Sequence, residues 1–229
     1  TNDYTNKRYT NWFPTVNLSF EIDEKESITL GYAKRIRRPR GFFLNPFPSR
    51  NSITNFFQGN PDLDPASTGS YDFGYLKRFK KFTLNGSIYY QRTTNNFQFV
   101  NEDTGETVVL SGNPNDPNSV LVIVPVLRRG PINLSKNKRY GGEASLTFTP
   151  NRKIRLNANF NVYRNEVIGT YNGFIFDAKN ISWSSRFISS INFGEGLSWQ
   201  NQFFLRGPRV TAQSKSKPLG GLSTAINKD

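Results

Sequence analysis

Two long stretches of the chain alternate residue by residue between apolar and small polar side chains. In the first stretch, every second residue is apolar or proline: Trp12, Pro14, Val16, Leu18, Phe20 and Ile22. In the second stretch, Arg or Asn separates the apolar positions Ile154, Leu156, Ala158, Phe160 and Val162. A period of two predicts β-strands with one apolar and one polar face. The fold therefore depends on whether the apolar face meets a protein core or lipid.

The composition excludes a helical membrane bundle. The chain has 229 residues, of which 35% are hydrophobic, and its mean hydropathy is -0.59. No stretch approaches the roughly 18 apolar residues that a membrane-spanning helix needs. A membrane β-barrel needs only alternate residues to be apolar, so this fold remains compatible with the composition. The 20 Phe and 10 Tyr residues favour strands and the aromatic belts of membrane interfaces.

The residue types that the chain lacks exclude several kinds of site. Cys, His and Met are all absent, so disulfides, thiolate sites, histidine metal sites and Ser-His or Cys-His catalytic triads are excluded. Most of the 17 acidic residues fall in predicted turns or loops, and they form no convincing pair for hydrolysis. We expect no enzymatic activity, no cofactor and no metal site. The net charge of +13 fits nucleic acid, an anionic membrane surface or an anionic ligand.

The order of strands and loops predicts an all-β fold, an antiparallel up-and-down transmembrane β-barrel. About nine strands are expected, at 11–22, 27–38, 69–79, 82–92, 138–149, 153–164, 179–193, 197–207 and 216–228. Each is close to the about 9–11 residues that a tilted membrane strand needs. Short connections at 23–26, 80–81, 150–152 and 194–196 alternate with long ones at 39–68, 93–137, 165–178 and 208–215. Tight periplasmic turns and long external loops give this alternation.

Turn-forming residues organise the two longest loops. The first loop is rich in Pro and Asn, which set turns and remove backbone donors, so we expect it to be structured but outside the sheet. In the second loop, Glu102-Asp103-Thr104-Gly105 predicts a hairpin turn whose strands extend beyond the membrane. Residues 113–118 predict a further turn.

The placement of charge favours lipid over a packed core. The polar positions within strands are mostly uncharged, as at Thr83, Asn85, Ser87 and Gln91, whereas Lys and Arg gather at strand ends. Aromatic residues also lie near strand ends, at Trp12, Phe79, Phe82, Phe148, Phe193 and Trp199. The alternative is a soluble basic β-sandwich that binds glycan or nucleic acid. Five residues break the pattern, which predicts either a register slip or contact with a plug: Ser185, Ser189 and Asn201 on the apolar face, Ile188 and Phe204 on the polar face.

Several motifs resemble one family of membrane proteins. They are Arg35-Ile36-Arg37-Arg38-Pro39, Leu44-Asn45-Pro46-Phe47, Gln58-Gly59-Asn60-Pro61-Asp62-Leu63-Asp64-Pro65, Ser70-Tyr71-Asp72-Phe73-Gly74-Tyr75 and Tyr140-Gly141-Gly142-Glu143. From about Tyr9 onward the chain resembles the barrel of TonB-dependent outer-membrane receptors, and in particular the outer membrane protein beta-barrel family common in Bacteroidetes. Ala66 departs from the family, which often has an acidic residue there.

This resemblance implies an architecture, a location and partners. Full receptors have roughly 22 strands, so residues 1–229 would be a single segment from the C-terminal side of a larger barrel. The chain opens with neither Met nor a signal peptide, and we expect the plug domain and the final strand to lie outside it. The expected location is the bacterial outer membrane. The expected partners are outer-membrane lipid and lipopolysaccharide, the plug of the same polypeptide, the TonB complex and a small nutrient, but not nucleic acid.

The implied function is import of a scarce nutrient: a siderophore, vitamin, peptide or glycan. A barrel that serves surface display or adhesion is the alternative within the same class. The first long loop and its rim supply the candidate ligand-binding residues: Arg35, Arg37, Arg38, Arg40, Phe42, Phe43, Phe47 and Phe57. Cationic side chains suit an anionic ligand or lipopolysaccharide phosphates, and aromatic rings can stack on a ligand. The alternation places Arg35 and Arg37 on the polar side and Lys34 on the apolar side.

Structural roles remain alternatives for the same residues. The basic residues could instead form ion pairs with a plug or with neighbouring strands, and the aromatic residues could pack the loop onto itself. Asn60, Asp62 and Asp64 present oxygen atoms at alternate positions, as calcium loops do. We interpret them as turn-forming residues instead.

Overall fold

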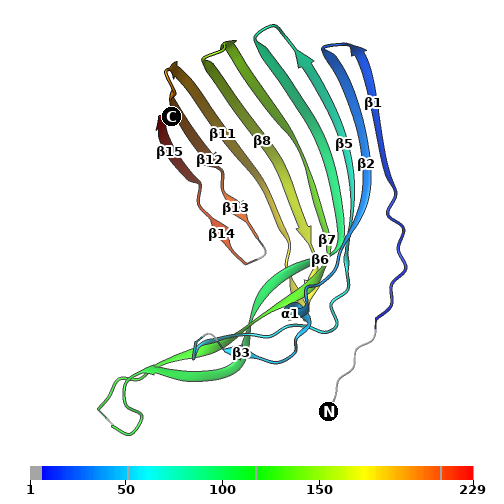
Figure 1. Ribbon diagram of the computed structural model, residues 1–229. Helices are drawn as coiled ribbons and strands as arrows, with labels where there is room; N and C mark the ends of the chain where they lie inside the picture. Colours follow the sequence, from blue (N-terminus) through cyan, green and yellow to red (C-terminus); the bar gives the residue numbers. More distant parts are fainter. Residues whose placement is uncertain (1–6, 51, 117, 212, 229) are drawn as a thin grey trace.

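One curved antiparallel sheet dominates the computed structural model (Figure 1), which describes residues 7–50, 52–116, 118–211 and 213–228. Within these ranges the long strands follow one another across the sheet in chain order: β1 (Thr15–Asp23), β2 (Glu26–Arg37), β5 (Ala66–Arg78), β6 (Phe82–Ser111), β7 (Val122–Asn151), β8 (Ile154–Ile168), β11 (Ala178–Gly194), β12 (Leu197–Arg206) and β15 (Leu219–Lys228). Each predicted strand is present, which confirms the up-and-down antiparallel architecture. Among the described residues, no helix has the length and apolar character needed to cross a membrane.

Strand register gathers the apolar residues on one side of the sheet. Leu18 lies opposite Leu30, Leu30 opposite Phe73, and Phe73 opposite Ile88. Residues opposite each other on neighbouring strands point to the same side, so successive strands build one continuous apolar face. This face is open, because the exposed fraction is 61% for Leu18 and 63% for Ile88.

The open apolar face shows that the soluble sandwich alternative is wrong. A sandwich would bury Val16 and Phe160 between two sheets, but these residues are 50% and 48% exposed. Moving one such side chain out of water stabilises a protein by about 1.5–3 kcal/mol. An apolar face that runs over the whole sheet therefore requires an apolar medium.

The residues that break the alternation do so without a register slip. Ser189 lies opposite both Leu156 and Asn201 on the apolar face, and Asn201 Nδ2 donates to Ser189 Oγ at 3.2 Å. The two polar side chains therefore satisfy each other. On the polar face, Phe204 lies opposite Gly221, where the missing side chain leaves room for its ring.

Short turns join the strands at one end of the sheet (Figure 1). Side-chain oxygens fix three of them. Asp23 Oδ1 accepts from Lys25 N at 2.6 Å, Asn151 Oδ1 from Lys153 N at 2.9 Å, and Asn192 Oδ1 from Gly194 N at 2.8 Å. In the last turn, Glu195 has a φ of 52° between two glycines of positive φ. The predicted short connections are confirmed.

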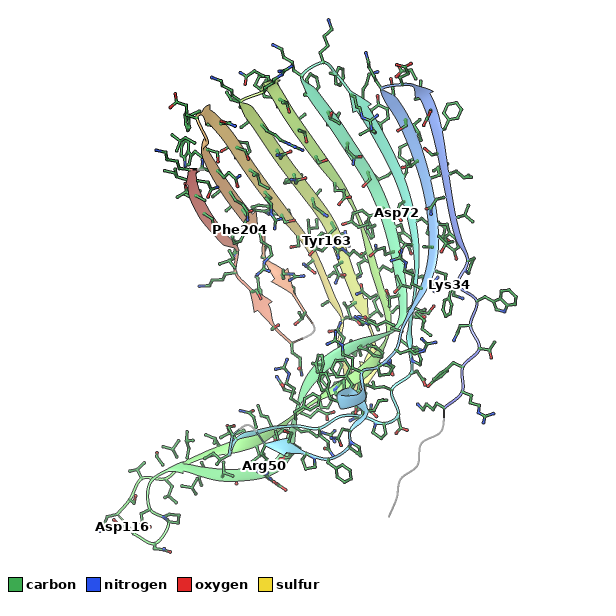
Figure 2. All side chains as sticks on the ribbon, in the orientation of Figure 1. Lys34, Arg50, Asp72, Asp116, Tyr163 and Phe204 are labelled. Atoms are coloured by element: carbon green, nitrogen blue, oxygen red, sulfur yellow. The ribbon has the colours of Figure 1, made fainter. Side chains whose placement is uncertain are left out.

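The hairpin turn predicted at 102–105 is wrong. Asp103 Oδ1 does accept from Gly105 N at 2.9 Å, and Gly105 has a φ of 77°, so the local turn chemistry is real. This local turn does not reverse the chain but shifts the register inside β6 after Asp103, and pairing with β7 resumes at Thr107 opposite Pro125. The chain reverses only after Ser111, where the described residues of 113–118 form the predicted turn. Residues 96–111 of β6 and 122–134 of β7 thus pair with each other beyond the neighbouring strands β5 and β8, and we call this part the β6–β7 extension. Figure 2 shows Asp116 at its tip.

The first long loop also differs from expectation, because part of it joins the sheet. It contains the short helix α1 (Gly41–Leu44) and two short strands, β3 (Ser49–Arg50) and β4 (Asn55–Phe57). β4 pairs in parallel with β7. This pairing was not predicted, since its partner, Leu127 to Arg129, lies in the far strand of the hairpin.

The buried apolar residues gather at the loop end of the strands and in the adjoining loops, not behind the middle of the sheet. One cluster contains Val100, Ile132, Leu134, Val167, Phe176 and Ala178, and a second contains Leu63, Ala66 and Phe97. The first connects the β6–β7 extension with the 169–177 loop, which carries β9 (Thr170–Tyr171) and β10 (Phe174–Ile175). The second connects the same extension with the first long loop, where Phe43 and Leu44 pack. The long loops thus form an ordered body at one end of the sheet.

Candidate ligand-binding site

The first long loop lies against the β6–β7 extension through backbone hydrogen bonds. Leu127 N donates to Thr54 O at 2.9 Å, and Gln58 N donates to Arg129 O at 3.0 Å. The loop then closes on itself, because Gly59 N donates to Asn45 O at 2.8 Å. A Cβ at position 59 would lie 2.5 Å from that same oxygen. Only glycine allows this close approach.

Phenylalanine rings from the loop and the extension form one cluster. Phe43 is its centre, with ring centroids 4.3 Å from Phe42, 5.1 Å from Phe99 and 6.4 Å from Phe97. Phe57 lies 5.8 Å from Phe42. These separations are those of favourable aromatic pairs. The structure therefore brings together three of the predicted aromatic residues, Phe42, Phe43 and Phe57.

Two arginines lie over this cluster. The guanidinium of Arg37 is 4.9 Å from the ring centroid of Phe97, and that of Arg129 is 5.5 Å from Phe99. Such cation–π contacts contribute about 0.5–1 kcal/mol at exposed sites. Arg37 also donates to Asn96 Oδ1 at 3.2 Å. Arg37 of β2 is thus held by two residues of β6, Asn96 and Phe97.

The other predicted residues lie apart from the ring cluster. Arg35 is exposed on the polar face opposite Thr68. Arg38 lines a separate cleft whose other walls include Tyr9, Leu44 and four prolines. Arg40 precedes α1, where its carbonyl accepts from Phe43 N at 2.9 Å. Phe47 is 75% exposed.

A second depression, of about 770 Å³, is bordered by the extension, by the 169–177 loop and by Phe56 and Gln58 of the first long loop, and it was not predicted. Arg128 and Glu102 form an ion pair across its wall, with Arg128 Nε donating to Glu102 Oε2 at 3.1 Å. Asn172 Nδ2 donates to the other carboxylate oxygen at 3.1 Å. The hydrogen bond that Arg128 donates to Glu102 raises the pKa of Arg128 above its ordinary value. This site joins residues far apart in sequence, and no local motif signals it.

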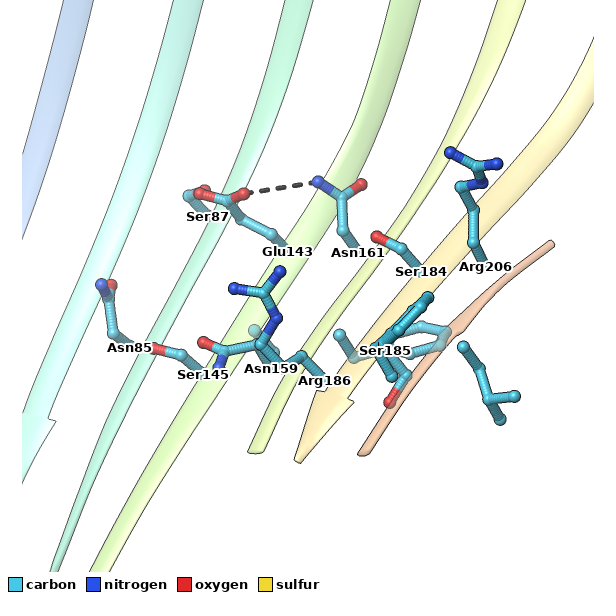
Figure 3. A pocket seen from close by; sticks show the side chains of 14 residues that line it. Asn85, Ser87, Glu143, Ser145, Asn159, Asn161, Ser184, Ser185, Arg186 and Arg206 are labelled. Carbon is cyan, nitrogen blue, oxygen red and sulfur yellow. Dashed lines mark hydrogen bonds between the residues drawn. The ribbon is translucent and has the colours of Figure 1, made fainter. Parts of the chain in front are cut away.

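The polar face of the sheet carries its own charged groups. Glu143 lies in a recess of about 600 Å³, where Ser87 Oγ donates to it at 3.2 Å and Asn161 Nδ2 at 3.4 Å (Figure 3). Arg186 and Arg206 line the same recess. Nearer the long loops, the guanidinium of Arg139 lies 3.9 Å from the ring centroid of Tyr163.

Several buried polar atoms on this face lack a hydrogen-bond partner. Within the described residues they are Asn137 Oδ1, Arg139 Nε, Asn180 Oδ1 and Ser182 Oγ. Register places all four residues on the polar side, near the long loops. A buried polar atom without a partner costs about 1–3 kcal/mol, so these atoms call for a partner from another element or from water.

The described residues hold no group of three acidic side chains that could bind a metal ion. Asn60, Asp62 and Asp64 behave as turn residues instead. Asn60 Oδ1 accepts from Asp62 N at 2.9 Å, and Lys7 Nζ forms an ion pair with Asp64 at 3.2 Å.

Comparison with known proteins assigns the family. The model of the outer membrane protein beta-barrel family matches residues 1–229. The chain belongs to this family. A search of curated proteins found no match.

Solved structures share the fold of this family member. The siderophore receptor PirA from Pseudomonas aeruginosa is similar with a TM-score of 0.64 and 14% identity, over 96% of this chain and 36% of the receptor. The ferric enterobactin receptor PfeA from the same organism is similar with a TM-score of 0.59 and 15% identity, over 96% of this chain and 32% of the receptor. The copper transporter OprC is similar with a TM-score of 0.60 and 13% identity, over 92% of this chain and 30% of the transporter. The chain thus spans about a third of the length of these proteins.

The family assignment settles what the two faces meet. The apolar face contacts outer-membrane lipid, and the polar face lines the interior of the barrel. Short turns mark the periplasmic end and long loops the external end. The expected resemblance to TonB-dependent receptor barrels and the outer-membrane location are both confirmed.

Proposed function

We propose that this barrel segment belongs to a TonB-dependent receptor that imports a scarce nutrient across the outer membrane. Its fold is similar to that of two siderophore receptors and a copper transporter. In the proposed mechanism, the external loops bind the nutrient. A plug encoded elsewhere in the same polypeptide is then moved by the TonB complex.

The observation that carries this proposal is the charge on the interior face. Glu143, Arg186 and Arg206 line a recess of about 600 Å³ on that face. A plug inside the barrel would meet the wall there, and its polar groups could pair with these side chains.

The external site favours an anionic ligand with an apolar or aromatic surface. The predicted rim residues Arg35, Arg38 and Arg40 are exposed cations. Phe42 and Phe47, with exposed fractions of 56% and 75%, offer ring faces from the first long loop. Phe43 and Phe57 pack against the ring of Phe42 and support it. Positive charge raises the rate at which anionic ligands reach such a site, and an anionic metal chelate fits it better than a neutral glycan.

The test uses the full-length receptor in its own host. Deletion of the gene is expected to abolish growth on one ferric chelate as the sole iron source, and the wild-type gene is expected to restore it. The triple variant Arg35→Ala, Arg38→Ala, Arg40→Ala is expected to lower uptake of that chelate by at least about tenfold, because three charges are removed from the rim. Undiminished uptake of every metal chelate and vitamin by the deletion strain would contradict import.

Adhesion is a second candidate, and one feature favours it. The tip of the β6–β7 extension exposes apolar side chains, including Leu110 at 54%, Val120 at 85% and Ile123 at 57%. Exposed apolar patches commonly mark contact surfaces. A deletion strain that grows normally on every nutrient but loses surface attachment would support this function instead.

A further inference from the structure

The β6–β7 extension is held on both of its edges where it lies near the barrel. Along the edge of β7, the short strand β4 pairs with the extension, and Leu127 N donates to Thr54 O at 2.9 Å. Along the edge of β6, the side-chain amide of Gln213 takes the place of a strand. Asn101 N donates to Gln213 Oε1 at 2.9 Å, and Gln213 Nε2 donates to Asn101 O at 3.1 Å. Toward the tip, no further strand of the described residues pairs with either edge.

This outer part of the extension is a two-stranded ribbon that is rich in apolar residues. Residues 107–109 of β6 pair with residues 123–125 of β7, and the exposed fraction is 54% for Leu110 and 57% for Ile123. From 107 to 127 the sequence has a single charged residue, Asp116, although the net charge of the chain is +13. A ribbon of two strands is at best marginally stable in water by itself. The ribbon would therefore gain stability from a further strand along one of its edges.

The alternating direction of the backbone groups shows which edge can accept such a strand. Leu127 N points away from β6, toward Thr54 O, so the backbone groups of Pro125 also point away from β6. Proline lacks an N–H, and a proline at this position protects an edge from pairing. On β6, Thr107 lies opposite Pro125, and residues opposite each other in an antiparallel pair direct their groups alike. The N–H and C=O groups of Thr107 and Val109 therefore point outward, from an edge without proline.

This edge of β6 is complementary to a second copy of itself. In antiparallel pairing about a two-fold axis at Val108, Thr107 of each copy lies opposite Val109 of the other. These two pairs use all the outward N–H and C=O groups of Thr107 and Val109. Glu106 then lies opposite Leu110 of the other copy, and the two Glu106 residues are about 13 Å apart. At that separation their repulsion is largely screened, so like charges do not oppose the pairing.

The extension also reaches far enough to meet another copy. In Figure 1 it turns aside from the barrel strands and projects beyond β15 in this view. The pairing of two such short edges buries less than the roughly 1,200 Å² of a standard interface. The contact is therefore expected to be weak in detergent, and to form where the outer membrane holds both copies in the same orientation.

We propose that the outward edge of β6 at Thr107–Val109 pairs with the same edge of a second copy of this chain, which joins two receptors through their external extensions. The second copy covers part of the apolar tip that adhesion would otherwise use. This contact lies outside the barrel and does not depend on the proposed transport function.

The first test is cysteine cross-linking in the outer membrane of the host. Residues 1–229 contain no cysteine, so the wild-type receptor supplies the background. Full-length receptor carrying Val108→Cys is expected to form a disulfide-linked dimer on oxidation, because the two-fold axis brings the Cα atoms at 108 to about 4.5 Å, within disulfide range. The control Glu106→Cys places its two thiols about 13 Å apart and is expected to remain unlinked.

Two outcomes of the cross-linking would overturn the proposal. Absence of the linked dimer with Val108→Cys would show that another loop of the receptor, or a different protein, covers this edge. Equal linking of Val108→Cys and Glu106→Cys would show random collision instead of the proposed register.

The second test removes one outward N–H in the Val108→Cys background. Val109→Pro leaves the hydrogen bonds between β6 and β7 intact, as Pro125 does on the opposite strand. It is expected to lower the yield of linked dimer by at least about tenfold, because each dimer loses two hydrogen bonds. The control Val109→Thr keeps the N–H and is expected to retain the yield. Limited proteolysis confirms that the extension of each variant is folded, and an undiminished yield with Val109→Pro would rule out the strand pairing.

Discussion

The guanidinium of Arg139 lies 3.9 Å from the ring centroid of Tyr163, although the two residues are on neighbouring strands and not directly opposite each other. The residue opposite Tyr163 is Gly141. A Cβ at position 141 would lie 2.2 Å from Val162 O and 2.7 Å from Tyr163 Cβ. Glycine therefore lets Tyr163 approach β7 closely enough for the arginine to stack on its ring.

Gly141→Ala is expected to destabilise the barrel wall by about 1–3 kcal/mol, because the added methyl group must displace backbone rather than a flexible side chain. The measurement is the urea midpoint of the full-length receptor in lipid vesicles. Gly86→Ala is the matched control, since its Cβ would meet only Glu143 O, at 3.8 Å. Equal effects of the two substitutions would contradict the role of the close approach.

Gly59→Ala tests the external loop. The new Cβ would lie within 3 Å of two backbone oxygens and one backbone nitrogen of Phe43 and Asn45, so the loop must open where it closes on itself. On the proposed function, we expect nutrient uptake to fall by about tenfold or more, since small displacements in a binding site are costly. The urea midpoint of the barrel should change little. Gly41→Ala is the control, because a Cβ there meets nothing within 4 Å.

The sheet was predictable because its signal is local and repeats every second residue. The alternation from Val16 to Ile22 and from Ile154 to Val162 reports which face each residue takes, and lipid enforces that alternation along every strand. The exceptions Ser189 and Asn201 did not upset the register, because they pair with each other.

The loops were less predictable because their structure depends on contacts distant in sequence. Asp103 and Gly105 have the chemistry of a hairpin turn, but pairing between Thr107 and Pro125 continues the strand beyond them. The parallel pairing of β4 is equally invisible from its own residues. Register also places Tyr32, Tyr71, Tyr90 and Tyr140 in one row across four strands. The sequence does not show this row, because it depends on the pairing of every strand between Tyr32 and Tyr140.

The ion pair between Arg128 and Glu102 leads to a prediction about pH. Because folding raises the pKa of Arg128, the stability that the Arg128 charge contributes is fully present at every pH below the ordinary arginine pKa. It is lost only as pH rises through the still higher pKa of the folded state. Arg128→Met is therefore expected to destabilise the extension by the same amount at about pH 6 and at about pH 9. The amount is at most about 1 kcal/mol, since both side chains are partly exposed to solvent.

Limited proteolysis of the extension at the two pH values provides the measurement. The expected result is a small rise in the cleavage rate of the variant, equal at both values. An effect that disappears toward the higher pH would show that Arg128 titrates in this range, against the direction of its pKa shift.

The two faces of one strand allow a direct test of the surrounding medium. Phe203 lies on the apolar face between Phe187 and Leu222, and the preceding residue, Gln202, lies on the polar face between Ile188 and Ser223. Phe203→Arg is expected to cost about 2–4 kcal/mol, because it places a cation in hydrocarbon. Gln202→Arg should change stability by no more than about 0.5 kcal/mol, because it faces the wet interior. Urea unfolding of both full-length variants in lipid vesicles measures the difference. A larger cost at position 202 than at 203 would mean that the faces are reversed, with Phe203 inside the barrel and Gln202 against lipid.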